Sequence, residues 1–286
     1  MAGEAANSIS VDKTHSLPSL WSSHAIAGSY SPVERITLPL CSDLVQLCDQ
    51  TKPFDDTSTR VFDNGAGTGI LTAQVQAHFP DTKVVAADIS QGMIDCLNQL
   101  SRSKQWRNVE TVVADAQALS FEESSFTHSM STFMIGSAEH PDRVIAEMYR
   151  VTVPGGMLGL GAWAGGCWGP IWQKAVRMAE CNETYTSPRL IHKNWDNEVK
   201  ITLGVEAEGW RVCQRKTSRS YWGWQSAEEV DQYIFEAGNP IVGLLMTDMA
   251  PHQIQKIRQC FRRVVEEDYH HGKDLYETAV LLTAMK

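Results

Sequence analysis

An aspartate followed by three glycines at alternate positions is the part of this sequence best suited to bind a ligand. The stretch reads DNGAGTG, with Asp63 and Asn64 directly before Gly65, Gly67 and Gly69. Glycines cost folding entropy and are kept where the chain must turn sharply or let another molecule approach the main chain. The strand-like run RVFD precedes them, and open parallel sheets bind ligands outside the carboxyl ends of their strands. The pattern predicts a ligand-binding turn.

Three classes of ligand compete for such a turn. A P-loop requires a lysine and a hydroxyl residue after its last glycine, whereas Ile70 and Leu71 follow Gly69 here. A dinucleotide site prefers G-x-G-x-x-G, and the carboxylate of Asp63 would repel a pyrophosphate. S-adenosylmethionine (SAM) carries a sulfonium and an ammonium group against one carboxylate, so its net positive charge suits Asp63. Of the three ligands, SAM therefore fits this turn best. The alternative is a glycine turn that has only a structural role and binds no ligand.

Further motifs follow in order along the chain. The run KVVAADIS ends at Asp88, about 20 residues beyond the glycines, where a carboxylate accepts hydrogen bonds from ribose hydroxyls. The run DISQGMID continues through Ile89 and Met93, and VVADAQALSFEESSF contains Asp115 and Ala116. A last stretch reads STFMIGSAEHPDRVIAEMYRVTVPGGML. Together these runs predict one cofactor site assembled at several strand ends.

From Arg60 to Trp163, the four ordered motifs resemble class I SAM-dependent methyltransferases; one departure is Ser120, where the family usually has proline. The resemblance implies that the acidic residue and the glycine backbone hold the methionine end of SAM, and that Asp88 binds the ribose. It implies contacts with adenine from the residues after Asp88 and from the Asp-Ala pair. The implied cofactor-binding set is Tyr30, Thr37, Asp63, Asn64, Gly65, Gly67, Gly69, Asp88, Ile89, Met93, Asp115, Ala116, Thr132 and Phe133.

Strand-like and helix-like runs alternate, which indicates βαβ units. The strands are expected at 60–63, 83–88, 109–114, 126–133, 157–163, 209–222 and 276–285. Helices are expected at 36–48, 71–79, 91–102 and 143–151, the last ended by the turn in VPGG. The predicted fold class is α/β, a doubly wound, mostly parallel Rossmann-like seven-stranded sheet with an N-terminal helical lid and a helical insertion before the last strand.

The same patterns predict how the chain is organised. Residues 1–20 are expected to be disordered, and residues 21–286 to form a single methyltransferase domain. Within it, 21–59 is the helical lid, 60–163 the SAM-binding core, and 164–208 with 224–275 the substrate-side helical elements. A long helix from Trp168 is expected to be followed by a polar stretch to Glu206, and 227–265 is expected to be helical.

Composition excludes several other classes of protein. The chain has 286 residues, 43% hydrophobic and 21% charged, with a net charge of -9. An acidic protein is a poor ligand for nucleic acid or an anionic membrane, so a small-molecule partner is expected. Seven scattered cysteines, the absence of an apolar run of about 18 residues, and a polar N-terminal stretch indicate a cytoplasmic protein with free thiols. No metal-site spacing is present, so no metal is predicted.

Methyl transfer chiefly needs alignment of the nucleophile, the methyl group and the leaving sulfur. A base is needed only for an acceptor that is protonated at neutral pH. His140 and His24 are the candidate bases, each with a surface or packing role as the alternative. The predicted substrate pocket is lined by Trp163, Trp168, Trp224 and Met246. The alternative for the tryptophans is a packed helix face.

Three functions from different classes fit these observations. The stretches VERITLPLCSDLVQL, SFTHSMSTF and LGAWAGGCWGPIWQKAV resemble fungal secondary-metabolite methyltransferases of the gliotoxin thiol methyltransferase type. That resemblance implies methyl transfer to an O, N or S atom of a small natural product, with Tyr30 and Thr37 closing over SAM. The second function is a SAM-binding cyclase or pericyclase that transfers no methyl group. The third is a regulatory protein on the same fold. Oligomeric state is not predicted.

Overall fold

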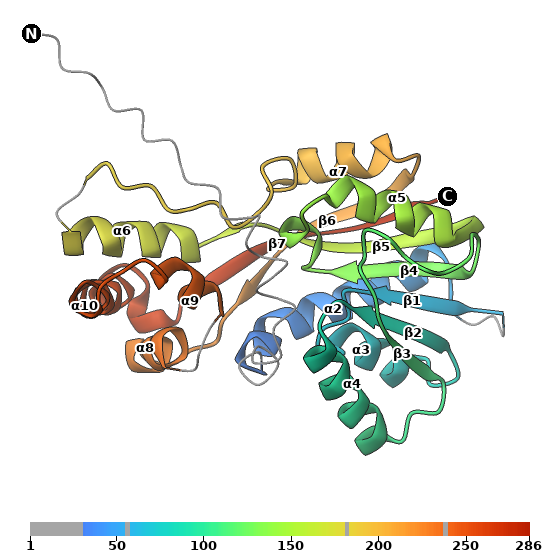
Figure 1. Ribbon diagram of the computed structural model, residues 1–286, viewed down its shortest axis with the longest axis horizontal. Helices are drawn as coiled ribbons and strands as arrows, with labels where there is room; N and C mark the ends of the chain where they lie inside the picture. The colour runs from blue at the N-terminus through green and yellow to red at the C-terminus, as the bar shows by residue number, and fades with distance from the viewer. Residues whose placement is uncertain (1–30, 55–57, 181–182, 237–239) are drawn as a thin grey trace, which may run out of the picture.

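A seven-stranded sheet forms the centre of the computed structural model, which describes residues 31–54, 58–180, 183–236 and 240–286. Its strand order is β3-β2-β1-β4-β5-β7-β6 (Figure 1). The strands are β1 (Arg60–Asn64), β2 (Lys83–Asp88), β3 (Val109–Val113), β4 (Phe126–Thr132), β5 (Thr152–Gly166), β6 (Arg211–Tyr221) and β7 (Tyr276–Met285). The strands from β1 to β5 pair in parallel, whereas β7 pairs antiparallel with both β5 and β6. The predicted α/β fold is confirmed.

Helices cover both faces of the sheet (Figure 1). On one face lie α2 (Ser31–Thr51), α3 (Ile70–His78) and α4 (Gln91–Lys104), and on the other α5 (Pro141–Val151) and α7 (Glu198–Ala207). Side chains alternate between the faces of a strand, so neighbouring β5 residues belong to different cores. Leu158 and Leu160 pack with α5 and α7, whereas Met157 packs with α2 and α3. Burial on both faces accounts for the apolar runs of the central strands.

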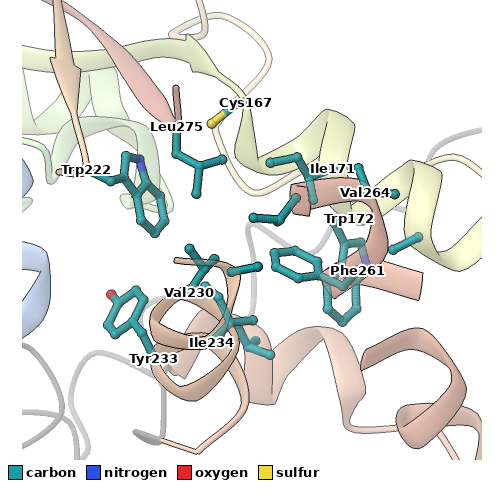
Figure 2. Close-up of a cluster of buried hydrophobic side chains, with 14 of the residues drawn as sticks. Cys167, Ile171, Trp172, Trp222, Val230, Tyr233, Ile234, Phe261, Val264 and Leu275 are labelled. Atoms are coloured by element: carbon teal, nitrogen blue, oxygen red, sulfur yellow. The ribbon is translucent and has the colours of Figure 1, made fainter. Parts of the chain in front are cut away.

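A group of helices lies beyond the ends of β5, β6 and β7, away from β3 (Figure 1). These helices are α6 (Trp168–Glu180), α8 (Ala227–Phe235), α9 (Pro240–Met246) and α10 (Pro251–Asp268). They share an apolar core that we call the aromatic cluster, drawn in part in Figure 2; its rings are Trp168, Trp172, Trp222, Trp224, Tyr233, Phe235 and Phe261. Trp168 and Trp172, one helical turn apart, pack on the same face of α6, as expected under the alternative for the tryptophans, and their ring centroids lie 5.9 Å apart.

Three local expectations are wrong. The stretch expected to remain polar up to Glu206 contains α7, whose N-terminus is capped by Asn197: the Asn197 Oδ1 accepts a hydrogen bond from the Lys200 backbone N–H at 3.1 Å. The segment expected as one helical region over 227–265 is divided into α8, α9 and α10. The VPGG turn does not separate α5 from the next strand, because β5 already begins at Thr152 and its register with β4 shifts across this stretch.

No helix among the described residues combines the length and the apolar character needed to cross a membrane. Within the same ranges, no group of three or more His, Cys, Asp or Glu side chains is arranged to hold a metal ion. Six cysteines of the described residues form no disulfide bond, and five of them are buried or partly buried: Cys41, Cys48, Cys96, Cys167 and Cys260.

Candidate functional site

Two adjoining cavities open at the carboxyl ends of β1, β2 and β4. The larger encloses about 820 Å³, counting its open mouth, and the smaller about 340 Å³. The larger cavity is lined by nine of the predicted cofactor residues: Gly65, Gly67, Asp88, Ile89, Met93, Asp115, Ala116, Thr132 and Phe133. Four of these, Gly65, Gly67, Thr132 and Phe133, also line the smaller cavity. The four sequence motifs therefore meet at one place.

The glycine turn forms a part of the wall of the larger cavity that carries no side chains. Gly67 has a φ angle of +56°, in the left-handed region, and a Cβ added there would meet no heavy atom of the described residues within 4 Å. The space next to Gly67 is thus free for a ligand to lie against the backbone. Gly69 has another role, because a Cβ there would lie 2.9 Å from the Leu97 side chain of α4. It permits close packing of two helices and lines neither cavity.

Asp63 and Asn64 are buried behind the turn. The Asp63 Oδ2 accepts hydrogen bonds from the Thr72 hydroxyl at 2.6 Å and the Thr72 backbone N–H at 3.2 Å. Within the described residues, the other oxygen, Oδ1, has no hydrogen-bond partner, and neither has the Asn64 Nδ2. Burial raises the pKa of Asp63 to about 7, although the Thr72 hydrogen bonds lower it and the charge of Asp88 raises it further. A buried carboxylate oxygen without a hydrogen-bond partner destabilises the folded protein unless a ligand supplies a donor.

Asp88 connects the end of β2 to the glycine turn. Its Oδ2 accepts a hydrogen bond from the Gly67 backbone N–H at 2.8 Å, and its Oδ1 accepts one from the Ser90 N–H at 2.9 Å. Burial raises its pKa, and these backbone N–H groups oppose the rise. Ser90 also caps α4, because its hydroxyl accepts a hydrogen bond from the Met93 N–H. The carboxylate thus holds the turn and the start of α4 at the cavity wall.

The remaining wall residues of the larger cavity differ in exposure. Met93 is 3% exposed, whereas Ile89 is 39% exposed. The cavity wall after β2 therefore includes one side chain held in the core and one exposed to solvent. Asp115 is exposed, and its Oδ1 accepts hydrogen bonds from the Gln117 backbone N–H and side-chain amide at 2.9 and 3.1 Å.

The smaller cavity lies between α2 and the glycine turn. Thr37 and Cys41, one helical turn apart on α2, both line it. Thr37 was predicted from the sequence, whereas Cys41 was missed. Its spacing four residues after Thr37 was the available signal, because residues i and i+4 share a helix face. Burial raises the pKa of the Cys41 thiol to about 12, which keeps it protonated and unreactive at neutral pH.

Phe133 occupies the junction of the two cavities and has an unusual backbone. Its φ angle is +60°, a conformation that costs energy for a large side chain. Its N–H donates to the Gly161 carbonyl at 2.7 Å. Its ring stacks on Trp163, with centroids 4.1 Å apart. Trp163 in turn packs against the aromatic cluster, so the Phe133–Trp163 stack connects the cavities to the helices beyond β5.

The other predicted residues are placed as follows. Trp168, Trp224 and Met246 belong to, or pack against, the aromatic cluster and line neither cavity. His140 is exposed, and its backbone N–H donates to Gln117 Oε1 at 2.7 Å. Tyr30 and His24 lie outside the described residues. The structure brings the cofactor motifs together, and His140 lines neither of the two cavities.

Comparison with known proteins identifies the core. Residues 61–156 match the family of methyltransferase domains. The match covers the glycine turn, the Asp88 motif and the Asp115–Ala116 motif, which are the segments that form the larger cavity. The core is therefore a class I SAM-dependent methyltransferase domain, and SAM is its cofactor.

Individual relatives are similar over longer stretches. The methyltransferase tpcH of Aspergillus fumigatus is 23% identical over 52% of this chain and 56% of its own length, so the match spans about half of that relative. The acetylaranotin bis-thiomethyltransferase of Aspergillus terreus is 24% identical over 70% of this chain and 72% of its own length. Among solved structures, the cyclase SpnF shares the fold with a TM-score of 0.54 and 19% identity, over 86% of this chain and 80% of SpnF.

Proposed function

We propose that this chain, whose core is a class I SAM-dependent methyltransferase domain, transfers a methyl group from SAM to an O, N or S atom of a small natural product. The observation that carries the proposal is the convergence of the four motifs on two adjoining cavities at the carboxyl edge of the sheet. The two fungal relatives support a place in fungal secondary metabolism.

The residues present fit SAM. The Asp63 Oδ1, buried and without a partner, is suited to accept a hydrogen bond from the ammonium group. Gly67 leaves open space for a ligand against its backbone. Asp88, Ile89, Met93, Asp115 and Ala116 line the larger cavity, which has room for the adenosine portion, whereas Thr37 lines the smaller cavity, on the side of Asp63. When bound, SAM supplies an electrophilic methyl group on a cationic sulfur.

The test of the proposal is product formation. Purified protein is incubated with SAM and separate thiol, phenol and amine acceptors, and mass spectrometry follows S-adenosylhomocysteine and the methylated acceptor. We expect both products with at least one acceptor class, in equal amounts. A protein that binds SAM but releases no S-adenosylhomocysteine with any acceptor contradicts methyl transfer.

The fold similarity to the cyclase SpnF favours one second candidate. In that case the protein would bind SAM and use it without consuming it, as a cyclase or pericyclase on the same fold. The same incubation separates the two functions: a rearranged substrate with SAM required but unconsumed supports the second candidate.

The affinity for SAM is expected to depend on pH through Asp63. The Asp63 carboxyl is protonated below about pH 7 in the folded protein, whereas an unburied carboxyl is protonated only below pH 3.8. Between these two pH values the folded protein therefore loses stability as the pH rises, and an ammonium group bound to the ionised carboxylate offsets this loss. One linked proton makes SAM binding tighten by up to about tenfold per pH unit as the pH rises toward 7.

Titration calorimetry between about pH 5.5 and pH 7.5 measures this dependence. In Asp63→Asn the dependence should flatten and the affinity should fall, since the side chain no longer ionises. An unchanged pH profile in a folded Asp63→Asn variant would show that Asp63 does not bind the ammonium group.

A further inference from the structure

The N-terminal part of α2, residues 31–38, is joined to the glycine turn by a side-chain hydrogen bond. The hydroxyl of Thr68, in the glycine turn, donates to the Glu34 Oε1 at 2.8 Å. Thr68 lines the smaller cavity, and so does Thr37, three residues after Glu34 on α2. Glu34 itself is partly buried and lines neither cavity. The hydrogen bond therefore connects two opposite walls of the smaller cavity from outside it.

A proline separates this N-terminal part from the rest of α2. Pro39 lies inside the helix, and because proline has no backbone N–H, the Arg35 carbonyl lacks the hydrogen bond that it would otherwise accept from residue 39. The packing also changes at this point. Ile36 belongs to the aromatic cluster, whereas Leu40 belongs to the core between α2, α3 and the sheet. The position of residues 31–38 therefore depends on contacts outside the helix.

Two further contacts join the N-terminal part of α2 to the side of β6 and α8. The Ser220 hydroxyl of β6 donates to the Ile36 carbonyl at 2.7 Å. The Arg35 guanidinium lies 5.8 Å from the centroid of the Trp224 ring, within the range of a cation–π interaction. Figure 1 shows α2 between α3 and the helices beyond β5. The N-terminal part is thus held from two sides, and Glu34 makes the hydrogen bond on the side of the glycine turn.

The two cavities depend on α2 to different extents. The helix contributes Thr37 and Cys41 to the wall of the smaller cavity, whereas none of its described residues lines the larger one. The smaller cavity suits the methionine portion of SAM, and the larger cavity has room for the adenosine portion. A shift of residues 31–38 away from Thr68 would therefore alter the space for the methionine portion and leave the walls of the larger cavity in place.

We propose that Glu34 is a positioning residue for the methionine portion of SAM. Its carboxylate accepts the Thr68 hydrogen bond and so fixes the distance between α2 and the glycine turn, without touching the cofactor. What the position requires is a hydrogen-bond acceptor for Thr68, and the charge of the carboxylate strengthens that hydrogen bond. The inference concerns binding of the cofactor, so it applies whether bound SAM is consumed by methyl transfer or left intact.

The experiment compares two ligands that differ in the methionine portion. S-adenosylhomocysteine has this portion, whereas 5′-methylthioadenosine keeps the adenosine and the sulfur but lacks the amino and carboxyl groups. Calorimetry measures the affinity of each variant for both. We expect Glu34→Ala to weaken S-adenosylhomocysteine binding by about tenfold, the lower end for a hydrogen bond to a charged group, because Glu34 is only partly buried. The affinity for 5′-methylthioadenosine should change by less than about threefold.

Two further variants test the route through Thr68. Glu34→Gln keeps an acceptor oxygen for the Thr68 hydroxyl, so it should lose less affinity for S-adenosylhomocysteine than Glu34→Ala. Thr68→Val removes the donor, and Glu34→Ala should then add less than about twofold, because the hydrogen bond is already absent. A loss in Glu34→Gln as large as that in Glu34→Ala, or losses that multiply in the double variant, would show that Glu34 acts on the cofactor by another route.

The control is Asp43→Asn, which removes a carboxylate on the same helix beyond Pro39, where Asp43 pairs with Lys216 at 2.6 Å. It should leave both affinities within about threefold of the wild type. Equal losses of both ligands in Glu34→Ala would mean that Glu34 has only a general structural role. An unchanged affinity for S-adenosylhomocysteine in Glu34→Ala would mean that the hydrogen bond does not shape the smaller cavity. Either result overturns the proposal.

Discussion

Gly67→Val is expected to lower the affinity for SAM by at least about 100-fold, which corresponds to about 2.8 kcal/mol. A Cβ at this position enters open space on the cavity wall, with no heavy atom from the described part of the chain within 4 Å. The branched side chain would therefore occupy the volume assigned to the ligand. It would also be held at a φ of +56°, which a β-branched residue rarely adopts. Calorimetry with SAM measures the loss, and circular dichroism shows whether the variant is folded.

Gly155→Val is the matched control for this substitution. Gly155 also has a positive φ, +72°, and a Cβ there also meets nothing within 4 Å, but it lies at the start of β5 and lines neither cavity. The two variants thus carry comparable backbone strain, and only one obstructs the site. Equal SAM affinity in Gly67→Val and Gly155→Val would mean that no ligand approaches the glycine turn closely.

Asp88→Ala is expected to weaken SAM binding by about 10- to 150-fold. A hydrogen bond to a charged group contributes about 1.5–3 kcal/mol, and the ribose offers two hydroxyls to this carboxylate. Part of the loss comes from the turn itself, because Asp88 also holds the Gly67 N–H at 2.8 Å. The comparison of S-adenosylhomocysteine with its 2′-deoxy analogue separates the two contributions. The wild type should discriminate between them, and Asp88→Ala should bind both almost equally.

Asp95→Ala controls for loss of a carboxylate near the same helix start. Asp95 is exposed on α4 and accepts a hydrogen bond only from its neighbour Gln91 at 2.8 Å. Its removal should leave SAM affinity within about threefold. If Asp88→Ala retains wild-type affinity while folded, or discriminates against the 2′-deoxy analogue as strongly as the wild type, Asp88 does not contact the ribose.

The strands of the fold were predictable because their signals are local. β2 and β7 begin and end at the predicted residues, since each contains a short run of consecutive apolar residues, VVAA in β2 and AVLL in β7. The helix α7 was not predictable in this way. Only one face of it is buried, through Ile201 and Val205, while Val199 and Leu203 are exposed. Apolar residues therefore do not lie on a single face of α7, and the helix is stabilised by packing against β6 and α5. These contacts cannot be recognised from the sequence alone.

The cofactor site was largely predictable because its residues sit at fixed offsets from strand ends. Asp88 and the glycines have backbone roles that the motif itself encodes. Cys41 and Met134 line the cavities without belonging to such a motif. Side chains that meet only through tertiary packing leave no periodic signal.

The antiparallel pairing of β5, β7 and β6 bears on how related proteins can come to accept different substrates. The chain leaves these paired strands after Gly166 and returns at Arg211, then leaves after Tyr221 and returns at Tyr276. Both excursions start and end on the three strands β5, β6 and β7, away from β1 and its glycine turn, so we expect that their length and composition can change without disturbing the turn. We therefore expect that exchanging the excursions as units would alter substrate range. The family match stops at residue 156, before either excursion begins.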